Sequence, residues 1–118
     1  MDDFQIVKLI GKGTFGSVFK CINDNDKKYY AVKKIKVLKQ NLSDNRGTLN
    51  ELHILYHNIC PFILKYFSCH YNNYELSIMT KYCSRGDLNK IIIKKCKTFN
   101  YFTENEIWKI FIQMCYAI

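Results

Sequence analysis

The chain has 118 residues, of which 48% are hydrophobic and 15% aromatic, and it contains a single proline. This composition excludes a mainly disordered protein and favours one compact unit with a single hydrophobic core. The formal net charge of +8 comes almost entirely from lysine, since Arg46 and Arg85 are the only arginines. Proteins that read nucleic acids are usually rich in arginine, so we expect no nucleic-acid partner.

The N-terminal sequence and the spacing of the cysteines indicate which cellular compartment to expect. The N-terminus is acidic and lacks the basic and apolar regions of a signal peptide, and no window approaches about 18 consecutive apolar residues. The six cysteines are scattered, and none belongs to a Cys-x-x-Cys pair of the kind that binds zinc. We therefore expect a cytoplasmic protein with reduced thiols, no membrane partner and no metal site within the chain.

Residues 10–18 carry three glycines in the spacing Gly-x-Gly-x-x-Gly. Without Cβ atoms at these positions, backbone N–H groups can approach a polyphosphate closely. The same spacing opens dinucleotide-binding folds, but there a helix follows the glycines. Here an apolar pattern resumes at Val18 and continues to Ile22, which predicts a β-hairpin with Phe15 at its tip. The hairpin disfavours a dinucleotide oxidoreductase and predicts a flap over phosphate groups.

Residues 28–37 read as a third strand after a polar turn at residues 23–26. Period-two alternation places Lys33 on the same face as Ala31 and Ile35, and Lys34 on the opposite face. A lysine on an apolar face is costly unless its ammonium group meets an anion. Alternatively, the lysine stem passes the sheet edge into solvent, or a bulge exchanges the two lysines. The sequence leaves these alternatives open.

A helix is expected to begin at Ser43 or Asp44 and to present an apolar stripe. The residues of this stripe are Leu49, Leu52, Leu55, Tyr56 and Ile59. Glu51 lies beside the stripe and is free to face the sheet if the helix begins that early. If the helix begins at Thr48 instead, Thr48 and Glu51 form a capping box. Both interpretations fit the sequence.

Two more strands are expected at residues 62–69 and 75–80, joined by a turn at residues 71–73. A short helix follows with Asp87 as its N-cap, and a longer amphipathic helix begins after Thr103 with Glu106 three residues on. Because no further element follows to cover the last apolar stripe, we expect the chain to end within a domain.

This ordered set resembles the small lobe of a eukaryotic protein kinase followed by the start of the large lobe. The glycines match the kinase glycine-rich loop, Ala31-Val32-Lys33 matches Val-Ala-Ile-Lys, and Glu51 matches the helix glutamate. The resemblance implies an α+β fold with a five-stranded antiparallel sheet and one inserted helix. It divides the chain into a small lobe at about 4–80, a hinge at 81–86 and a truncated large lobe at 87–118.

The resemblance also implies a role for each matching residue. Lys33 would hold the α- and β-phosphates of ATP, and Glu51 would hold Lys33, so these two are the catalytic candidates. Thr80 would be the gatekeeper, the backbone at 81–83 would meet adenine, and Asp87 would reach the ribose. The full set implied for the nucleotide site is Ile10, Gly11, Lys12, Gly13, Thr14, Phe15, Gly16, Ser17, Val18, Ala31, Lys33, Thr80, Lys81, Cys83 and Asp87.

Residues 79–88 are similar to the hinge of the NIMA-related (NEK) serine/threonine kinases, which commonly reads Met-Glu-Tyr-Cys-x-x-Gly-Asp-Leu. The chain departs from that family at Thr80, Lys81 and Cys60. This resemblance implies transfer of the ATP γ-phosphate to serine or threonine of a protein substrate, in the cytoplasm, the nucleus or at microtubules.

The kinase catalytic loop and the Asp-Phe-Gly motif do not occur in the chain. We therefore expect the Mg²⁺ ligands to lie outside it, and the chain alone to transfer no phosphate. The alternative is a non-catalytic ATP-binding or pseudokinase-like interaction module. The sequence leaves the oligomeric state open.

Overall fold

The computed structural model describes residues 3–37 and 46–118. The chain divides into two compact units. The first comprises Met1–Ile59 and Leu64–Tyr82, and the second comprises Cys60–Ile63 and Cys83–Ile118. Within the described ranges, no helix is long and apolar enough to cross a membrane.

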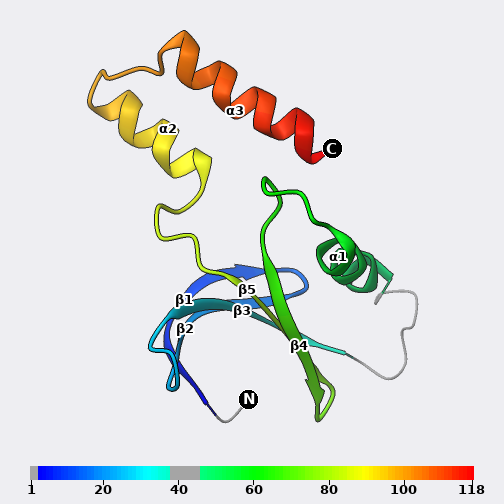
Figure 1. The fold of residues 1–118 in the computed structure, drawn as a ribbon. Coiled ribbons are helices and arrows are strands. Elements are labelled where there is room, and N and C mark those ends of the chain that lie inside the picture. The colour runs from blue at the N-terminus through cyan, green and yellow to red at the C-terminus, as the bar shows by residue number, and fades with distance from the viewer. Residues whose placement is uncertain (1–2, 38–45) are drawn as a thin grey trace. The chain divides into compact units, whose positions relative to one another are not determined.

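The first unit is a five-stranded antiparallel sheet with one helix (Figure 1). The strand order is β1-β2-β3-β5-β4, and helix α1 lies between β3 and β4 in the chain. The elements are β1 (Phe4–Gly13), β2 (Gly16–Asn23), β3 (Tyr29–Lys36), α1 (Arg46–His57), β4 (Tyr66–Asn72) and β5 (Glu75–Lys81). The predicted α+β class and the five-stranded sheet with its inserted helix are confirmed.

Strands β1 and β2 form the predicted hairpin, and no helix follows the glycines. Gly13 pairs with Gly16, so Thr14 and Phe15 form the tip. The pairing shifts twice along β1, and the second shift leaves Ile10 without an opposing residue. A bulge turns a side chain away from strict alternation, which explains two consecutive apolar residues before the first glycine.

Strand β3 keeps one unbroken register against both of its neighbours. Lys33 lies opposite Val18 on β2 and Ile78 on β5, whereas Lys34 lies opposite Ser17 and Ser77. A bulge that would exchange the two lysines is therefore excluded. Lys33 shares the face of the buried core residues, as alternation predicted.

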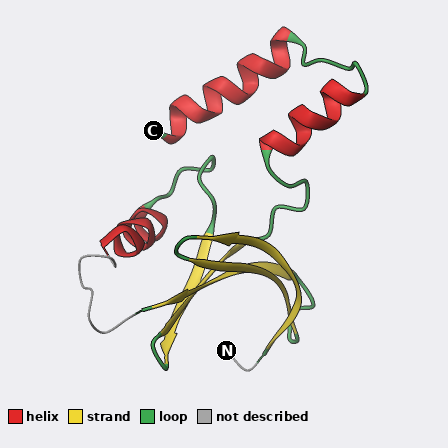
Figure 2. Cartoon of the chain, turned by 180° about the vertical axis from the view of Figure 1, so that it is seen from behind, coloured by secondary structure: helices red, strands yellow, loops and turns green. Residues whose placement is uncertain are grey.

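The core of the first unit is the buried cluster of Ile35, Leu76 and Ile78. Leu52 and Leu55 from α1 pack against this cluster, as do Val37 and Tyr66. Both ribbon views accordingly place α1 beside β4 (Figures 1 and 2). Burial of these apolar side chains holds the helix against the sheet.

The expected apolar stripe of α1 is wrong in part. Leu49 and Tyr56 are 57% and 67% exposed, and Ile59 lies beyond the helix at 98% exposure. Only part of the helix circumference meets the sheet, and Thr48, 7% exposed, shares the covered side with the two packed leucines. The expected helix start at Ser43 or Asp44 lies outside the described residues.

Strand β4 begins at Tyr66, not at residue 62 as predicted. Pro61 lacks an N–H for strand pairing, and the N–H of Ile63 instead donates to the carbonyl of Cys60 at 3.2 Å to close a turn. The turn that joins β4 to β5 lies at Asn73 and Tyr74 and not at residues 71–73 as expected, because Tyr71 and Asn72 still pair with β5. Asn73 and Tyr74 have positive φ, 49° and 60°, as a two-residue hairpin turn of this kind requires.

The second unit contains helices α2 (Leu88–Lys97) and α3 (Glu104–Ala117). The Asp87 carboxylate accepts a bond from the N–H of Lys90 at 2.8 Å, which confirms it as the N-cap of α2. The α3 capping box is complete, because Thr103 Oγ1 accepts from the Glu106 N–H and the Glu106 carboxylate accepts from the Thr103 N–H. That second bond lowers the pKa of Glu106 below its usual value.

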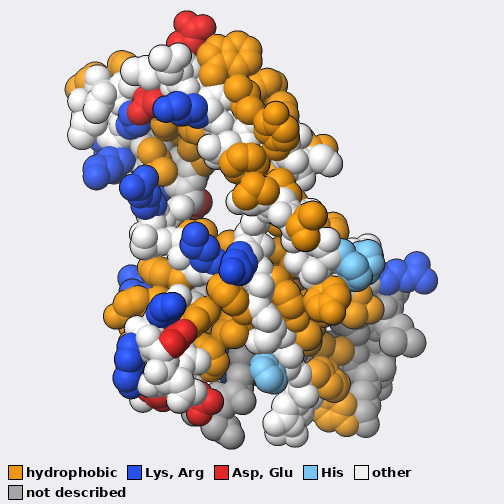
Figure 3. All heavy atoms as spheres, in the orientation of Figure 1, with side chains coloured by type: hydrophobic (Ala, Val, Ile, Leu, Met, Phe, Trp, Pro, Cys, Tyr) orange, Lys and Arg blue, Asp and Glu red, His pale blue; other side chains and the backbone are white. Residues whose placement is uncertain are grey.

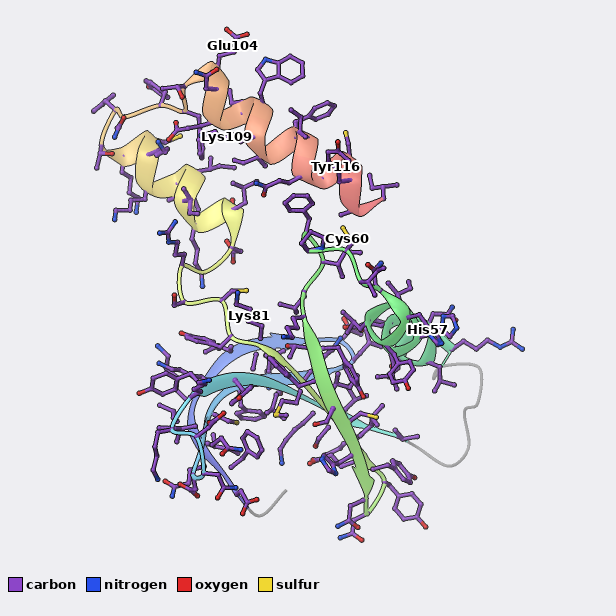
Figure 4. The ribbon with its side chains drawn as sticks, in the orientation of Figure 1. His57, Cys60, Lys81, Glu104, Lys109 and Tyr116 are labelled. Atoms are coloured by element: carbon purple, nitrogen blue, oxygen red, sulfur yellow. The ribbon has the colours of Figure 1, made fainter. Side chains whose placement is uncertain are left out.

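Residues 60–63 join the second unit at the C-terminal end of α3. The thiol of Cys60 lies 3.6 Å from the carbonyl oxygen of Tyr116, and both residues are labelled in Figure 4. The rings of Phe62 and Tyr116 have centroids 6.1 Å apart. Phe62 therefore makes this ring contact within the second unit.

Replacing Thr103 by alanine removes one acceptor of the α3 capping box. We expect Thr103→Ala to destabilise the start of α3 by about 1 kcal/mol, because an N-cap acceptor is lost. Amide hydrogen exchange in the first turn of α3 measures this effect. Asn105→Ala, an exposed position in the same turn, is the control, and equal exchange rates in the two variants would contradict the prediction.

Candidate functional site

The central contact of the site is an ion pair between β3 and α1. Lys33 Nζ lies 2.9 Å from Oε1 and 2.6 Å from Oε2 of Glu51, so both carboxylate oxygens accept from one ammonium group. Two alternatives that the sequence left open are therefore wrong. Thr48 lies inside α1 and does not cap it with Glu51, and the lysine side chain ends on an anion of its own chain.

This ion pair is partly open to solvent. The side chains of Lys33 and Glu51 are 27% and 44% exposed. Ion pairs that water can screen contribute only about 0–1 kcal/mol to stability, so the main effect of this contact is to fix the position of the Lys33 side chain. Glu51 holds one ammonium group at a defined point on the sheet face while leaving part of it accessible.

The neighbouring lysine has a partner of its own on the other face of the sheet. Lys34 Nζ lies 2.9 Å from Oε1 of Glu75, with side-chain exposures of 33% and 37%. The two pairs are alike in length and exposure but point to opposite faces. Lys34 is therefore the natural control for any role assigned to Lys33.

Small and apolar side chains surround Lys33 on its face of the sheet. Val18 is its partner on β2, and Ala31 lies opposite Thr80 of β5. Ala31 and Thr80 are each 8% exposed, and the Thr80 hydroxyl lies 3.5 Å from the Ala31 carbonyl oxygen. The face therefore presents one cation beside small and mostly apolar side chains.

The three glycines of the hairpin are not equivalent. Gly16 has φ of +154°, and a Cβ there would collide with the carbonyl oxygen of Lys34. A Cβ at Gly11 would lie 3.7 Å from Val18, and one at Gly13 would lie 4.0 Å from the nearest atom, both ordinary distances. Of these three glycines, only Gly16 is required by the fold. The other two leave open backbone that a bulky anionic group could approach.

A cation between two aromatic rings flanks this face and was missed by the sequence reasoning. Lys20 Nζ lies 3.8 Å from the ring centroid of Tyr29 and 4.9 Å from that of Tyr82. The two rings are 6.3 Å apart. Such cation–π contacts tie the end of the first unit to β2 and β3. The sequence alone does not predict these contacts. They depend on the strand register, which pairs Lys20 with Ala31, two residues from Tyr29 on β3.

The remaining predicted site residues lie in three places. Lys12, Thr14 and Phe15 are exposed on the hairpin, and Phe15 at its tip is 63% exposed. Lys81, labelled in Figure 4, ends β5, and its N–H donates to the carbonyl of Lys65 at 2.9 Å. Cys83 and Asp87 belong to the second unit, and their part in a nucleotide site stays a prediction.

The described residues also bear on the metal and thiol predictions. Within 3–37 and 46–118, no group of three or more His, Cys, Asp or Glu side chains could hold a metal ion. Burial raises the pKa of the Cys21 thiol.

A family model described as "Protein kinase domain" matches residues 4–118. The chain belongs to the protein kinase family. Relatives include Wee1-like protein kinase 1-B of Xenopus laevis, 31% identical over 115 residues, and Wee1-like protein kinase 2 of Sus scrofa, also 31% identical. Each match covers 95% of this chain but only 19% and 20% of the relative, so the chain spans about a fifth of these kinases.

The subfamily suggested by the hinge sequence is not supported by these relatives. They carry Wee1-like names, whereas residues 79–88 had suggested a NIMA-related kinase. A hinge pattern of a few residues is a weak guide to subfamily. The kinase family itself is shown, and its placement among NIMA-related enzymes is not.

The kinase residues present fit a nucleotide. The ammonium group of Lys33 is held by Glu51 and remains partly exposed, so it can donate to phosphate oxygens as well. Gly11 and Gly13 leave room beside Val18, and Ala31 keeps the floor low. A protein kinase domain generally implies ATP and Mg²⁺, and the first unit provides the cation and open backbone that a polyphosphate needs.

The difference among the glycines predicts different effects of substitution. We expect Gly16→Ala to destabilise the first unit by about 1–3 kcal/mol, because φ is unfavourable and the new Cβ meets the backbone of β3. Gly13→Ala should change stability by only about 0.5 kcal/mol, because nothing crowds its Cβ. Thermal unfolding followed by circular dichroism compares the two, and equal melting temperatures would show that Gly16 is not required by the fold.

Proposed function

We propose that the first unit forms the ATP-binding face of a protein kinase active site. The Lys33–Glu51 ion pair carries this proposal, because it places an accessible cation on the sheet face beneath a glycine hairpin. A partly exposed ion pair adds little to the free energy of folding, so its main effect is to fix the position of the Lys33 ammonium group. A polyphosphate is the ligand that needs a fixed cation beside open backbone N–H groups.

Each residue of the face would contribute by its own chemistry. Lys33 would donate hydrogen bonds to phosphate oxygens, and Glu51 would keep its side chain extended toward them. Val18 and Ala31 would cover the two sides of a purine ring, and the backbone at 81–83 would meet its edge. Bound Mg²⁺ would neutralise phosphate charge, with its ligands supplied from outside the described residues.

The reaction proposed for the whole protein is transfer of the ATP γ-phosphate to a hydroxyl group of a protein substrate. The serine/threonine class of acceptor and the NIMA-related placement rest on the hinge resemblance alone. A Wee1-like placement rests on relatives of which the chain covers about a fifth. A cytoplasmic location stays a prediction from the N-terminal sequence.

Exchanging lysine for methionine at two adjacent positions tests the site. In the full-length protein, we expect Lys33→Met to lower phosphate transfer about 100-fold or more, because an oriented cation is lost from the phosphates. Lys34→Met should keep transfer within about threefold, since Lys34 and Glu75 occupy the opposite face. Transfer of labelled phosphate to a generic protein substrate measures both.

Two further readouts decide what a negative result means. Unfolding midpoints of the two variants should be similar, because each loses one partly exposed ion pair. Binding of a fluorescent ATP analogue should weaken in Lys33→Met and not in Lys34→Met. Analogue binding without any phosphate transfer in the unsubstituted protein would favour the non-catalytic ATP-binding module. Full transfer by Lys33→Met would contradict the proposed site.

The acceptor class has a direct test of its own. If the NIMA-related resemblance is correct, phosphoamino-acid analysis of the substrate should yield phosphoserine or phosphothreonine. The same measurement on the Lys33→Met variant is the control for contaminating kinases. Phosphotyrosine as the sole product would exclude the serine/threonine class and leave the nucleotide site unaffected.

A further inference from the structure

Helix α2 in the second unit is strongly basic. It carries four lysines, Lys90, Lys94, Lys95 and Lys97, and no acidic residue. Lys90, Lys94 and Lys97 are spaced by four and three positions, so they lie on one face of the helix. In Figure 3, lysine and arginine side chains gather over α2, whereas apolar side chains follow α3.

Lys95 differs from the other three because contacts within the unit occupy it. Its ammonium group lies 3.4 Å from the Glu106 carboxylate and 4.6 Å from the ring centroid of Phe102. Lys95 therefore joins α2 to the start of α3. Within the described ranges, no carboxylate lies at ion-pair distance from Lys90, Lys94 or Lys97.

The stability of helix α2 does not explain why this face is basic. Lysines in the last turn favour the helix dipole, which accounts for Lys94 and Lys97. Lys90 lies near the N-terminal end, where a positive charge opposes the dipole. Like charges three and four residues apart also repel each other. Repulsion among these three lysines weakens the isolated helix, and an anionic group bound at this face would relieve it.

The same face is hollowed and has an apolar centre. A surface hollow of about 390 Å³ is lined by Lys90, Ile93, Lys94, Lys97 and Thr98. Ile93 is 46% exposed and lies between the lysines in sequence. An apolar side chain of a ligand can therefore rest on Ile93 while its acidic groups meet the surrounding ammonium groups.

We propose that this face of α2 binds an acidic segment of a partner protein, with an apolar residue flanked by carboxylate or phosphate groups. An apolar centre suits a peptide side chain and offers nothing to a nucleic-acid backbone. The cations are all lysines, which lack the planar fork of arginine for reading bases. The surface lies wholly within the second unit, so the inference does not depend on the proposed nucleotide site.

Fluorescence polarisation without nucleotide tests the proposal. The probe is a labelled peptide in which one leucine is flanked on both sides by aspartate and glutamate. Binding to the chain should weaken about tenfold in the triple variant Lys90→Gln, Lys94→Gln, Lys97→Gln, and should weaken as salt rises. Lys90→Arg, Lys94→Arg, Lys97→Arg keeps the charge and should retain binding.

Matched controls separate this surface from a general effect of net charge. The control variant Lys8→Gln, Lys28→Gln, Lys36→Gln removes three exposed lysines from the first unit and should bind the peptide normally. Replacing leucine by serine in the peptide should weaken binding, since the contact with Ile93 is lost. Equal loss in both triple variants, or no loss in either, would overturn the proposal. So would tighter binding of a single-stranded oligonucleotide or of vesicles rich in phosphatidylserine through the same lysines.

Discussion

The Lys33–Glu51 ion pair is the contact on which the geometry of the candidate site depends. It joins the middle of β3 to α1 across residues 38–45, and it forms only if both elements have the correct rotation. The strand register turns Lys33 to the core face, and the packing of Leu52 and Leu55 turns Glu51 toward it. Apolar burial thus sets the rotation of the helix, and the ion pair uses that rotation to fix one cation.

The glycine hairpin is coupled to the same strand by a backbone contact. Gly16 passes so close to the carbonyl oxygen of Lys34 that no Cβ fits between them. The lysine that faces the candidate site and the flap above it are therefore both positioned by β3. The hairpin is held against β3 at Gly16. Its backbone at Gly11 and Gly13 is uncrowded and therefore open to a ligand. The proposed binding of a polyphosphate would use this open backbone as a set of preorganised donors.

The second unit uses its charges differently. Lys95 is paired with Glu106 and stabilises the junction of two helices, whereas the lysines on the basic face of α2 have no carboxylate partner in the described part of the chain. In the first unit, Lys33 and Lys34 are both paired within the protein. Lys95 thus contributes to the fold of the second unit, and the three lysines of the basic face are those proposed to bind an acidic ligand.

By itself, the sequence determined the features that depend on short-range periodicity and local hydrogen bonds. These are the hairpin and the N-caps Asp87 and Thr103, whereas the face on which Lys33 lies was decided by the register of β3 in the sheet. Only the tertiary structure decided that Glu51 binds Lys33 instead of capping its helix, since that choice depends on how α1 packs against the sheet. Packing likewise decided which side of α1 is covered. Both results depend on contacts between residues that are distant in the chain, and the local periodicity of the sequence cannot predict such contacts.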